Sequence, residues 1–298
     1  MPVTGTLSVR RLWWHASRPA TLAASISPVV VGLGVAAHLG GISWTRSLAA
    51  LGVAVALQFG VNYANDYSDF RHGADGGSRL GPPRAAASGL ISPGLVLGAA
   101  LASFLVAALI GAWLCAVTSW WLLGVGAVCL LAAWLYTGGP RPYGYRGYGE
   151  LAVFVFFGLV ATCGTVYVEV GKIGTLAVLA SILPGSLAAA LLLINNIRDI
   201  PTDAAAGKRT LAVILGARRS RRLLLGLVAL ALAVPLFIAI PGIEHFTVFL
   251  PWLVVPTLDG PLRNAAAEDP RLQIRALQQM GAVLAASSVL LALGIWAG

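Results

Sequence analysis

The chain has 298 residues, of which 58% are hydrophobic and only 10% are charged, and its formal net charge is +9. This balance is typical of repeated membrane spans and excludes an ordinary soluble domain. The basic residues interrupt apolar segments and form no separate polar domain, which argues against a nucleic-acid-binding protein. Cys115, Cys129 and Cys163 lie inside apolar runs without metal-ligand or redox spacing, so we expect neither a disulfide nor a thiolate metal site.

Apolar runs of about 20 residues, the length that crosses a bilayer as a helix, recur along the chain. The confident helices are expected at 19–38, 47–66, 92–117, 119–137, 150–169, 174–197, 223–240 and 277–297. A further run at 246–258 is short and contains Pro251 and Pro256, so hydropathy alone does not decide whether it crosses. The sequence predicts an all-α, polytopic membrane protein.

The distribution of basic residues indicates whether the ninth run, 246–258, crosses the membrane. If it crosses and the N-terminus is cytoplasmic, only Arg46 and Lys172 of the 20 Lys and Arg lie outside. If it does not cross, Arg263, Arg271 and Arg275 also move outside, which fits the positive-inside rule less well. We therefore predict nine transmembrane helices in the cell membrane, with the C-terminus outside.

The connections at 67–91, 138–149 and 198–222 are long and polar, and all fall on the predicted cytoplasmic side. Function is therefore expected to face the cytoplasm. We predict one domain, 1–298, made of two related four-helix units at about 19–137 and 150–258 plus a final helix, because an Asp-rich stretch closes the second helix of each unit.

The first Asp-rich stretch is NYANDYSDFRHGAD, residues 62–75. Its Asn and Asp residues are spaced so that a continuing helix would carry them on one face. They are Asn62, Asn65, Asp66 and Asp69, with Asp75 further on. The second stretch, NNIRDIPTDAAAGKRT, has Asn195, Asp199 and Asp203 four residues apart, with Pro201 predicting a stop or kink.

Five carboxylates at one membrane face repel one another, so their proximity requires cations between them. Oxygen-only ligands of this kind suit Mg²⁺, which usually shares its coordination shell with water and substrate phosphate. The pattern therefore predicts a magnesium site that holds a diphosphate.

Basic residues accompany both stretches, and Arg and Lys suit phosphate oxygens. They are Arg79 and Arg84 after the first stretch, and Arg198, Lys208 and Arg209 around the second. The loop YTGGPRPYGYRGYGE, residues 136–150, combines glycines with aromatic rings, and its Tyr145 and Arg146 are the residues best able to face a phosphate or an aromatic acid.

Two other interpretations of the acidic stretches stay open. The acids are either solvated helix ends in cytoplasmic loops, or ligands for a coupling ion in a transporter or a lipid-diphosphate binding protein. The repetition of Asn and Asp at helical spacing argues against the first. Their position at one membrane edge argues against the second, because transport sites usually lie at midplane.

These stretches, together with RLGPPR at 79–84, resemble the UbiA superfamily of intramembrane prenyltransferases. The resemblance is strongest to its 1,4-dihydroxy-2-naphthoate polyprenyltransferase branch, which the tyrosine-rich loop and NNIRDI favour over relatives that use other acceptors. The chain departs from the broad superfamily pattern at Gly73, where an acid is usual, and carries Asp75 two residues later.

The resemblance implies a nine-helix bundle that transfers a polyprenyl group from polyprenyl diphosphate to 1,4-dihydroxy-2-naphthoate, or to another acceptor in a sister enzyme. For the naphthoate, CO₂ and diphosphate are released and demethylmenaquinol, a menaquinone precursor, is formed. The residues implied as Mg²⁺ ligands are Asn62, Asn65, Asp66, Asp69, Asp75, Asn195, Asp199 and Asp203. Those implied at the diphosphate are Arg79, Arg84, Arg198, Lys208, Arg209 and Asn196. The catalytic set implied is Asp66, Asp69, Asp199, Asp203, Tyr145 and Arg146.

Overall fold

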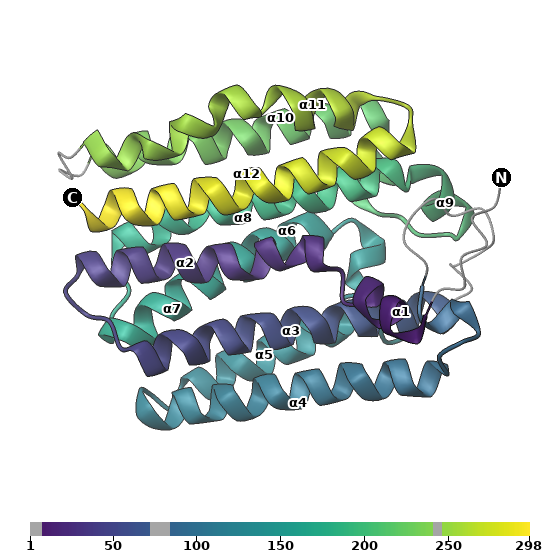
Figure 1. The fold of residues 1–298 in the computed structure, drawn as a ribbon, viewed down its shortest axis with the longest axis horizontal. Helices are drawn as coiled ribbons and strands as arrows, with labels where there is room; N and C mark the ends of the chain where they lie inside the picture. The colour runs from purple at the N-terminus through teal and green to yellow at the C-terminus, as the bar shows by residue number, and fades with distance from the viewer. Residues whose placement is uncertain (1–7, 72–83, 241–245) are drawn as a thin grey trace.

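The protein is an all-helical bundle. The computed structural model describes residues 8–71, 84–240 and 246–298, and every regular element in these ranges is a helix. The long helices lie side by side along the bundle, with α1 at one end and the C-terminal end of α12 at the other (Figure 1). The prediction of an all-α protein is confirmed.

The first half of the chain contains α1 (Val9–Ala16), η1 (Pro19–Thr21), α2 (Leu22–His38), α3 (Trp44–Arg71), η2 (Ala86–Ser88), α4 (Pro93–Val117), α5 (Leu122–Leu135) and η3 (Tyr143–Arg146). The second half contains α6 (Gly149–Val153), η4 (Phe154–Val160), α7 (Ala161–Val170), α8 (Thr175–Arg198), α9 (Ile200–Ala205), α10 (Leu211–Ala239), η5 (Phe246–Thr257), α11 (Asp259–Ala266) and α12 (Pro270–Trp296).

Six helical segments of the described chain are long and apolar enough to cross a membrane, namely α3, α4, the α6–α7 run, α8, α10 and α12. Three shorter apolar helices, α2, α5 and η5, accompany them. All of these segments coincide with runs expected from the sequence, which supports a multi-pass membrane protein. The exact number of crossings stays a prediction.

The undecided run at 246–258 forms the 3₁₀ helix η5 and leads directly into α11. Pro251 and Pro256 lack the N–H that an α-helical hydrogen bond needs, and two of them within six residues disfavour an α-helix here. Together η5 and α11 run along the length of the bundle and end where α12 begins (Figure 1). The short apolar run of η5 is therefore extended by α11, an amphipathic helix whose polar residues keep it out of a hydropathy prediction.

The run expected as one helix at 150–169 is interrupted by the π-helical segment η4. Gly158, inside η4, faces Gly185 of α8, and a Cβ atom on Gly158 would lie 2.7 Å from the Gly185 Cα. The two backbones therefore approach as closely as they do because neither residue has a side chain. π-helical turns are frequent next to functional sites, and Phe156 and Phe157 of η4 line the cavity described below.

Replacing Gly158 with alanine is expected to lower the free energy of unfolding by about 1–3 kcal/mol, because the added methyl group meets backbone that has no room to move. The thermal unfolding midpoint in detergent measures the effect. Gly226→Ala in α10 is the matched control, because no atom of the described chain lies within 4 Å of its Cβ position. An unchanged midpoint for Gly158→Ala would contradict the close packing of η4 on α8.

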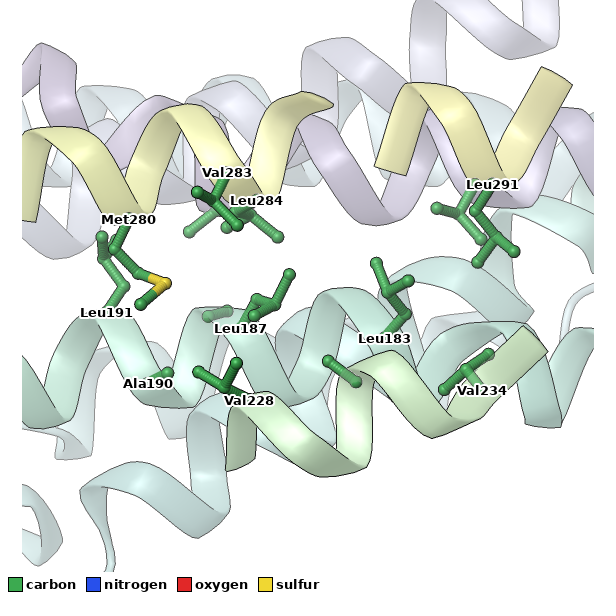
Figure 2. Close-up of a cluster of buried hydrophobic side chains, with 14 of the residues drawn as sticks. Leu183, Leu187, Ala190, Leu191, Val228, Val234, Met280, Val283, Leu284 and Leu291 are labelled. Carbon is green, nitrogen blue, oxygen red and sulfur yellow. The ribbon is translucent and has the colours of Figure 1, made fainter. Parts of the chain in front are cut away.

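The hydrophobic core lies between α8, α10 and α12 (Figure 2). Leu183, Leu187 and Leu191 recur on α8 at helical spacing and face Met280 and Leu284 of α12. α8 is the helix most enclosed by its neighbours, so its direction and rotation are fixed by packing on several sides. The position of α8 sets the position of Asp199, because α8 ends at Arg198 and Asp199 leads directly into α9.

Candidate active site

A large cavity connects the two Asp-rich stretches. Its volume is about 970 Å³, and its wall combines a polar end with a long apolar part drawn from α2, α3, α4, α5, η4 and α7. The charged and amide side chains that line it include Asn62, Asn65, Asp69, Arg84, Asn195, Asn196, Arg198, Asp199, Asp203 and Lys208. Residues from both stretches therefore face one space, as a shared site requires.

Asp69 is the centre of the polar end. Its Oδ1 accepts hydrogen bonds from the Tyr145 hydroxyl and from Lys208 Nζ, each at 2.7 Å, and its Oδ2 accepts one from Arg84 Nη2 at 2.8 Å. Lys208 lies 139 residues further along the chain, so this ion pair joins the two stretches directly. With only 4% of Asp69 exposed, the two cations offset the cost of burying its charge.

Asp199 begins the turn that separates α8 from α9. Arg198 binds it with two hydrogen bonds, Nε to Oδ1 and Nη2 to Oδ2, both 2.7 Å long. The same guanidinium donates to the Asn195 Oδ1 at 2.8 Å. Arg198 and Asn195 thus fix the direction of the Asp199 carboxylate toward the cavity.

Asp203 and Tyr145 complete the polar end around Lys208. Lys208 Nζ lies 3.9 Å from Asp203 Oδ1 and 4.6 Å from the centre of the Tyr145 ring, a cation–π distance. The Tyr145 carbonyl accepts a hydrogen bond from the Arg209 backbone N–H at 2.9 Å, which ties the tyrosine-rich loop to the second stretch. The loop therefore contributes to the site through Tyr145.

Asp66 has a different environment from Asp69. It is fully buried, its Oδ2 accepts the Ala85 N–H at 2.9 Å and its Oδ1 accepts the Ala86 N–H at 3.3 Å. It is not among the residues of the described chain that line the cavity. In this arrangement Asp66 anchors the segment that carries Arg84, and its predicted role as a metal ligand stays a prediction.

The predicted amide ligands also hold the fold together. Asn62 Nδ2 donates to the Ser17 carbonyl at 2.8 Å, and its Oδ1 accepts from Gln58 at 3.1 Å. Asn65 Oδ1 accepts the Thr137 hydroxyl at 2.6 Å. Both line the cavity, so each combines a contact between elements with a polar surface for a ligand.

Two predicted residues lie away from the cavity. The side chains of Arg146 and Arg209 are exposed and do not contribute to the lining found in the described chain. Arg146 is followed by Gly147 in a left-handed conformation, where the loop turns toward α6. The predicted roles of these two arginines at the site stay predictions. Asp75 and Arg79 lie outside the described residues.

Some residues in and beside the cavity were not predicted from the sequence. Arg18 lines the cavity and has φ 49°, a left-handed conformation that is uncommon outside glycine. Strained backbone conformations of this kind cluster at functional sites. In the sequence, however, Arg18 looks like one of the basic residues that set the orientation of the first membrane helix. Gln58 and Thr137, which line the cavity, and Glu150, which lies beside it, were not singled out. Gln58 is a single polar residue inside the apolar run 47–66, and Thr137 and Glu150 lie at the two ends of the loop 136–150, where the tyrosines and arginines were the stronger candidates.

Within the described residues, no group of three or more His, Cys, Asp and Glu side chains is arranged as a ready metal site. The acids at the polar end are instead held by Arg84, Arg198 and Lys208. The donor set nevertheless fits Mg²⁺, because Asp69, Asp199 and Asp203 offer hard oxygen atoms to one cavity.

Burial raises the pKa of the Tyr145 phenol well above its ordinary value of 10.0, and the neighbouring Asp69 charge raises it further. Both effects disfavour the phenolate, so Tyr145 stays a hydrogen-bond donor. Burial also raises the pKa of Tyr143, to about 12. Stability from these phenols is present below about pH 10, where unfolded tyrosines ionise, and is lost as the pH rises further.

Tyr145→Phe is expected to slow the prenyl transfer that the resemblance implies about tenfold, because Asp69 loses a buried hydrogen bond. The variant should also lose less thermal stability than the unmodified protein between pH 9 and about pH 11, since it has one fewer raised phenol. Tyr148→Phe is the control, because Tyr148 is 58% exposed. If thermal stability depends on pH identically in Tyr145→Phe and in the unmodified protein, the pKa of Tyr145 is not raised in the folded state.

Comparison with known proteins places the chain in a family. The UbiA prenyltransferase family matches residues 25–267. The 1,4-dihydroxy-2-naphthoate octaprenyltransferase of Mycobacterium tuberculosis is 48% identical over 257 residues, covering 86% of this chain and 84% of the relative. The enzyme of the same name from Haemophilus influenzae is 36% identical and covers 97% of this chain and 96% of its own.

A UbiA homolog from Archaeoglobus fulgidus, solved bound to GPP and Mg²⁺, has the same fold. The TM-score is 0.65, with 94% of this chain and 99% of that chain covered, at 16% identity. At this level of identity the likeness concerns the fold alone. From the family match and the two sequence relatives, the chain belongs to the UbiA prenyltransferase family.

Proposed function

We propose that this protein transfers a polyprenyl group from polyprenyl diphosphate to 1,4-dihydroxy-2-naphthoate, with release of CO₂ and diphosphate. The product is demethylmenaquinol, so the step belongs to menaquinone biosynthesis. The observation that carries the proposal is the single cavity that joins both Asp-rich stretches to an apolar space. The shared name of the Mycobacterium tuberculosis and Haemophilus influenzae relatives supports the choice of acceptor.

Mg²⁺ would be held by Asp69, Asp199 and Asp203, with Asn65 and Asn195 nearby on the same wall. The Archaeoglobus fulgidus homolog, solved with Mg²⁺ and GPP, supports a divalent cation at this kind of site. When bound, the metal supplies positive charge that stabilises the departing diphosphate.

The diphosphate oxygens would be bound by Arg84, Arg198 and Lys208. Each of these cations is largely buried and each already binds a carboxylate of the site. A fork-shaped guanidinium binds two phosphate oxygens at once, and an ammonium acts as a point charge. Positive charge held in place before the reaction stabilises the leaving group without reorganisation.

In the reaction the allylic C–O bond breaks and its electron pair leaves with the diphosphate. The ring carbon that carries the carboxylate then forms the new C–C bond, and the C–C bond to the carboxylate breaks as CO₂ departs, which restores the aromatic ring. Tyr136, Tyr143 and Tyr145 line the cavity, and an aromatic ring face turned to the allylic cation would stabilise it.

The apolar part of the cavity suits a polyprenyl tail. It continues away from the charged end between α3, α5 and the η4–α7 segment, where the lining includes Val53, Leu57, Gly126, Leu130, Val160 and Gly164. Small residues in this wall leave space for a chain of isoprene units. Burying such a tail within an apolar groove avoids exposing it to water.

We further propose that the polar end of the bundle faces the cytoplasm, with the C-terminus outside the cell membrane. The polar stretches and α1 lie at the same end, opposite the end of α12 (Figure 1). The positive-inside rule supports this orientation. The chain would act as one domain with two related four-helix units, at 19–137 and 150–258, and a final helix.

The decisive experiment uses purified protein in lipid nanodiscs with Mg²⁺, polyprenyl diphosphates of several lengths and a panel of aromatic acids. Mass spectrometry is expected to detect prenylated quinol and CO₂ loss with 1,4-dihydroxy-2-naphthoate. A preference for another aromatic acid would instead indicate a sister prenyltransferase. Diphosphate binding in a fixed ratio without pyrophosphate release would overturn the enzymatic proposal in favour of a binding protein or transporter.

A further inference from the structure

Glu150 is a buried carboxylate beside the site that the proposed mechanism does not use. It lies in the first turn of α6 and is 5% exposed. Its Oε1 accepts a hydrogen bond from Asn196 Nδ2 at 2.9 Å, whereas its Oε2 is buried without a hydrogen-bond partner in the described chain. Among the described residues no Lys or Arg forms an ion pair with it. Burying a carboxylate in this way costs free energy, so its presence indicates a functional role.

The hydrogen bond from Asn196 fixes how that side chain is oriented. A carboxylate accepts hydrogen bonds and donates none, so the Asn196 amide must point its NH₂ group at Glu150. Asn196 is 8% exposed, lines the cavity and lies three residues before Asp199 on the last turn of α8. Its carbonyl oxygen is therefore available to accept a hydrogen bond from a ligand.

The oxygens of the three other asparagine side chains in the cavity wall already have donors. Asn62 Oδ1 accepts from Gln58, Asn65 Oδ1 accepts from Thr137, and Asn195 Oδ1 accepts from Arg198. In the described part of the chain, Asn196 Oδ1 accepts no such bond. Among the asparagines of the wall, Asn196 therefore presents an oriented hydrogen-bond acceptor, three residues from Asp199.

We propose that Glu150 is a positioning residue that orients Asn196 so that Asn196 Oδ1 accepts a hydrogen bond from a hydroxyl group of the aromatic acceptor. This inference rests on the proposed function and adds what selects the acceptor. Accepting that hydrogen bond increases electron density on the phenolic oxygen and hence on the ring carbon that attacks. The predicted acceptor class is a phenol or naphthol, and its methyl ether is rejected.

The proposal is tested by binding alone, without prenyl diphosphate, so that turnover plays no part. The probes are 1-hydroxy-2-naphthoate and 4-hydroxy-2-naphthoate, each compared with its methyl ether by calorimetry in nanodiscs. The unmodified protein is expected to bind at least one hydroxyl form about tenfold more tightly than its ether, the effect of one buried hydrogen bond. Equal affinity within both pairs would overturn the proposal.

Glu150→Gln is expected to remove this preference. A glutamine amide can donate to Asn196 Oδ1, which lets the Asn196 side chain reverse and present its NH₂ group to the cavity. The double variant Glu150→Gln with Asn196→Asp is expected to restore the preference, because the introduced glutamine donates to one oxygen of the introduced aspartate and the other oxygen faces the ligand. This exchange keeps the net charge constant, and general disruption of packing would not be reversed by it.

Two results would overturn the positioning role: a hydroxyl preference retained in Glu150→Gln, or one not restored in the double variant. If Glu150→Gln does not fold, Asn196→Ser provides the test, since it removes the oriented carbonyl and should abolish the preference. Prenyl transfer by the unmodified protein is measured separately. Active protein without a hydroxyl preference would refute this inference alone, and absence of transfer would refute the proposed function.

Discussion

Asp69→Asn is expected to lower the rate of prenyl transfer by at least about 10³-fold, because it removes the charge around which the polar end is organised. Asp69 binds Arg84, Lys208 and Tyr145 at once, so the substitution weakens metal binding and also releases both cations from their positions. Pyrophosphate release per folded protein in nanodiscs measures the effect. The unfolding midpoint should also fall, since two buried cations lose a partner.

Asp259→Asn is the matched control for this substitution. Asp259 forms an ion pair with Arg263 one helical turn away, and both side chains are largely exposed. Surface pairs of this kind contribute little to stability, so both turnover and unfolding should stay unchanged. Turnover by Asp69→Asn within tenfold of the unmodified rate would show that the carboxylate at 69 is not central to the chemistry.

Removal of divalent metal is expected to have an effect of similar size. Chelation with EDTA should reduce transfer by at least about 10³-fold, and added Mg²⁺ should restore it, because charge on the leaving diphosphate would otherwise be unbalanced. Mn²⁺ should also restore activity, since it accepts the same oxygen ligands. Full turnover in EDTA would rule out a metal-dependent mechanism.

The residues that hold the metal can be tested without turnover. In the unmodified protein, Mg²⁺ and a non-hydrolysable prenyl diphosphate analogue together should raise the unfolding midpoint more than either alone, since each binds the folded state through the other. Asp199→Asn should lose this joint effect, because Asp199 faces the cavity from the second stretch. The control is again Asp259→Asn, which should keep it.

Much of the fold follows from the sequence. Long apolar runs predict the membrane helices, because a bilayer has a fixed thickness and leaves no backbone polar group unpaired. Hydropathy alone left the run at 246–258 undecided, because it does not register that the polar segment α11 continues the run, and the prediction of a crossing came from the basic residues. The interruption by η4 was missed because the pairing of Gly158 with Gly185 is a contact between distant segments.

The site was predicted in type and only partly in detail. Asp66 and Asp69 are three residues apart and looked equivalent as ligands, yet Asp69 faces the cavity whereas Asp66 binds the backbone at Ala85 and Ala86. Which of two neighbouring side chains points inward depends on how α3 is rotated by its neighbours. Arg146 was predicted to face the substrate, but its side chain is exposed and does not line the cavity found in the described chain, so its role stays a prediction.

The sequence by itself determined a helical membrane protein with two Asp-rich stretches, and it predicts the chemistry of a metal-bound diphosphate, since hydropathy, residue type and local spacing are properties of the linear chain. Only the tertiary structure decided which atoms meet. The ion pair between Lys208 and Asp69 spans 139 residues, and the bond from Asn196 to Glu150 joins two helices. Such contacts depend on helix rotation and packing, which no local pattern contains.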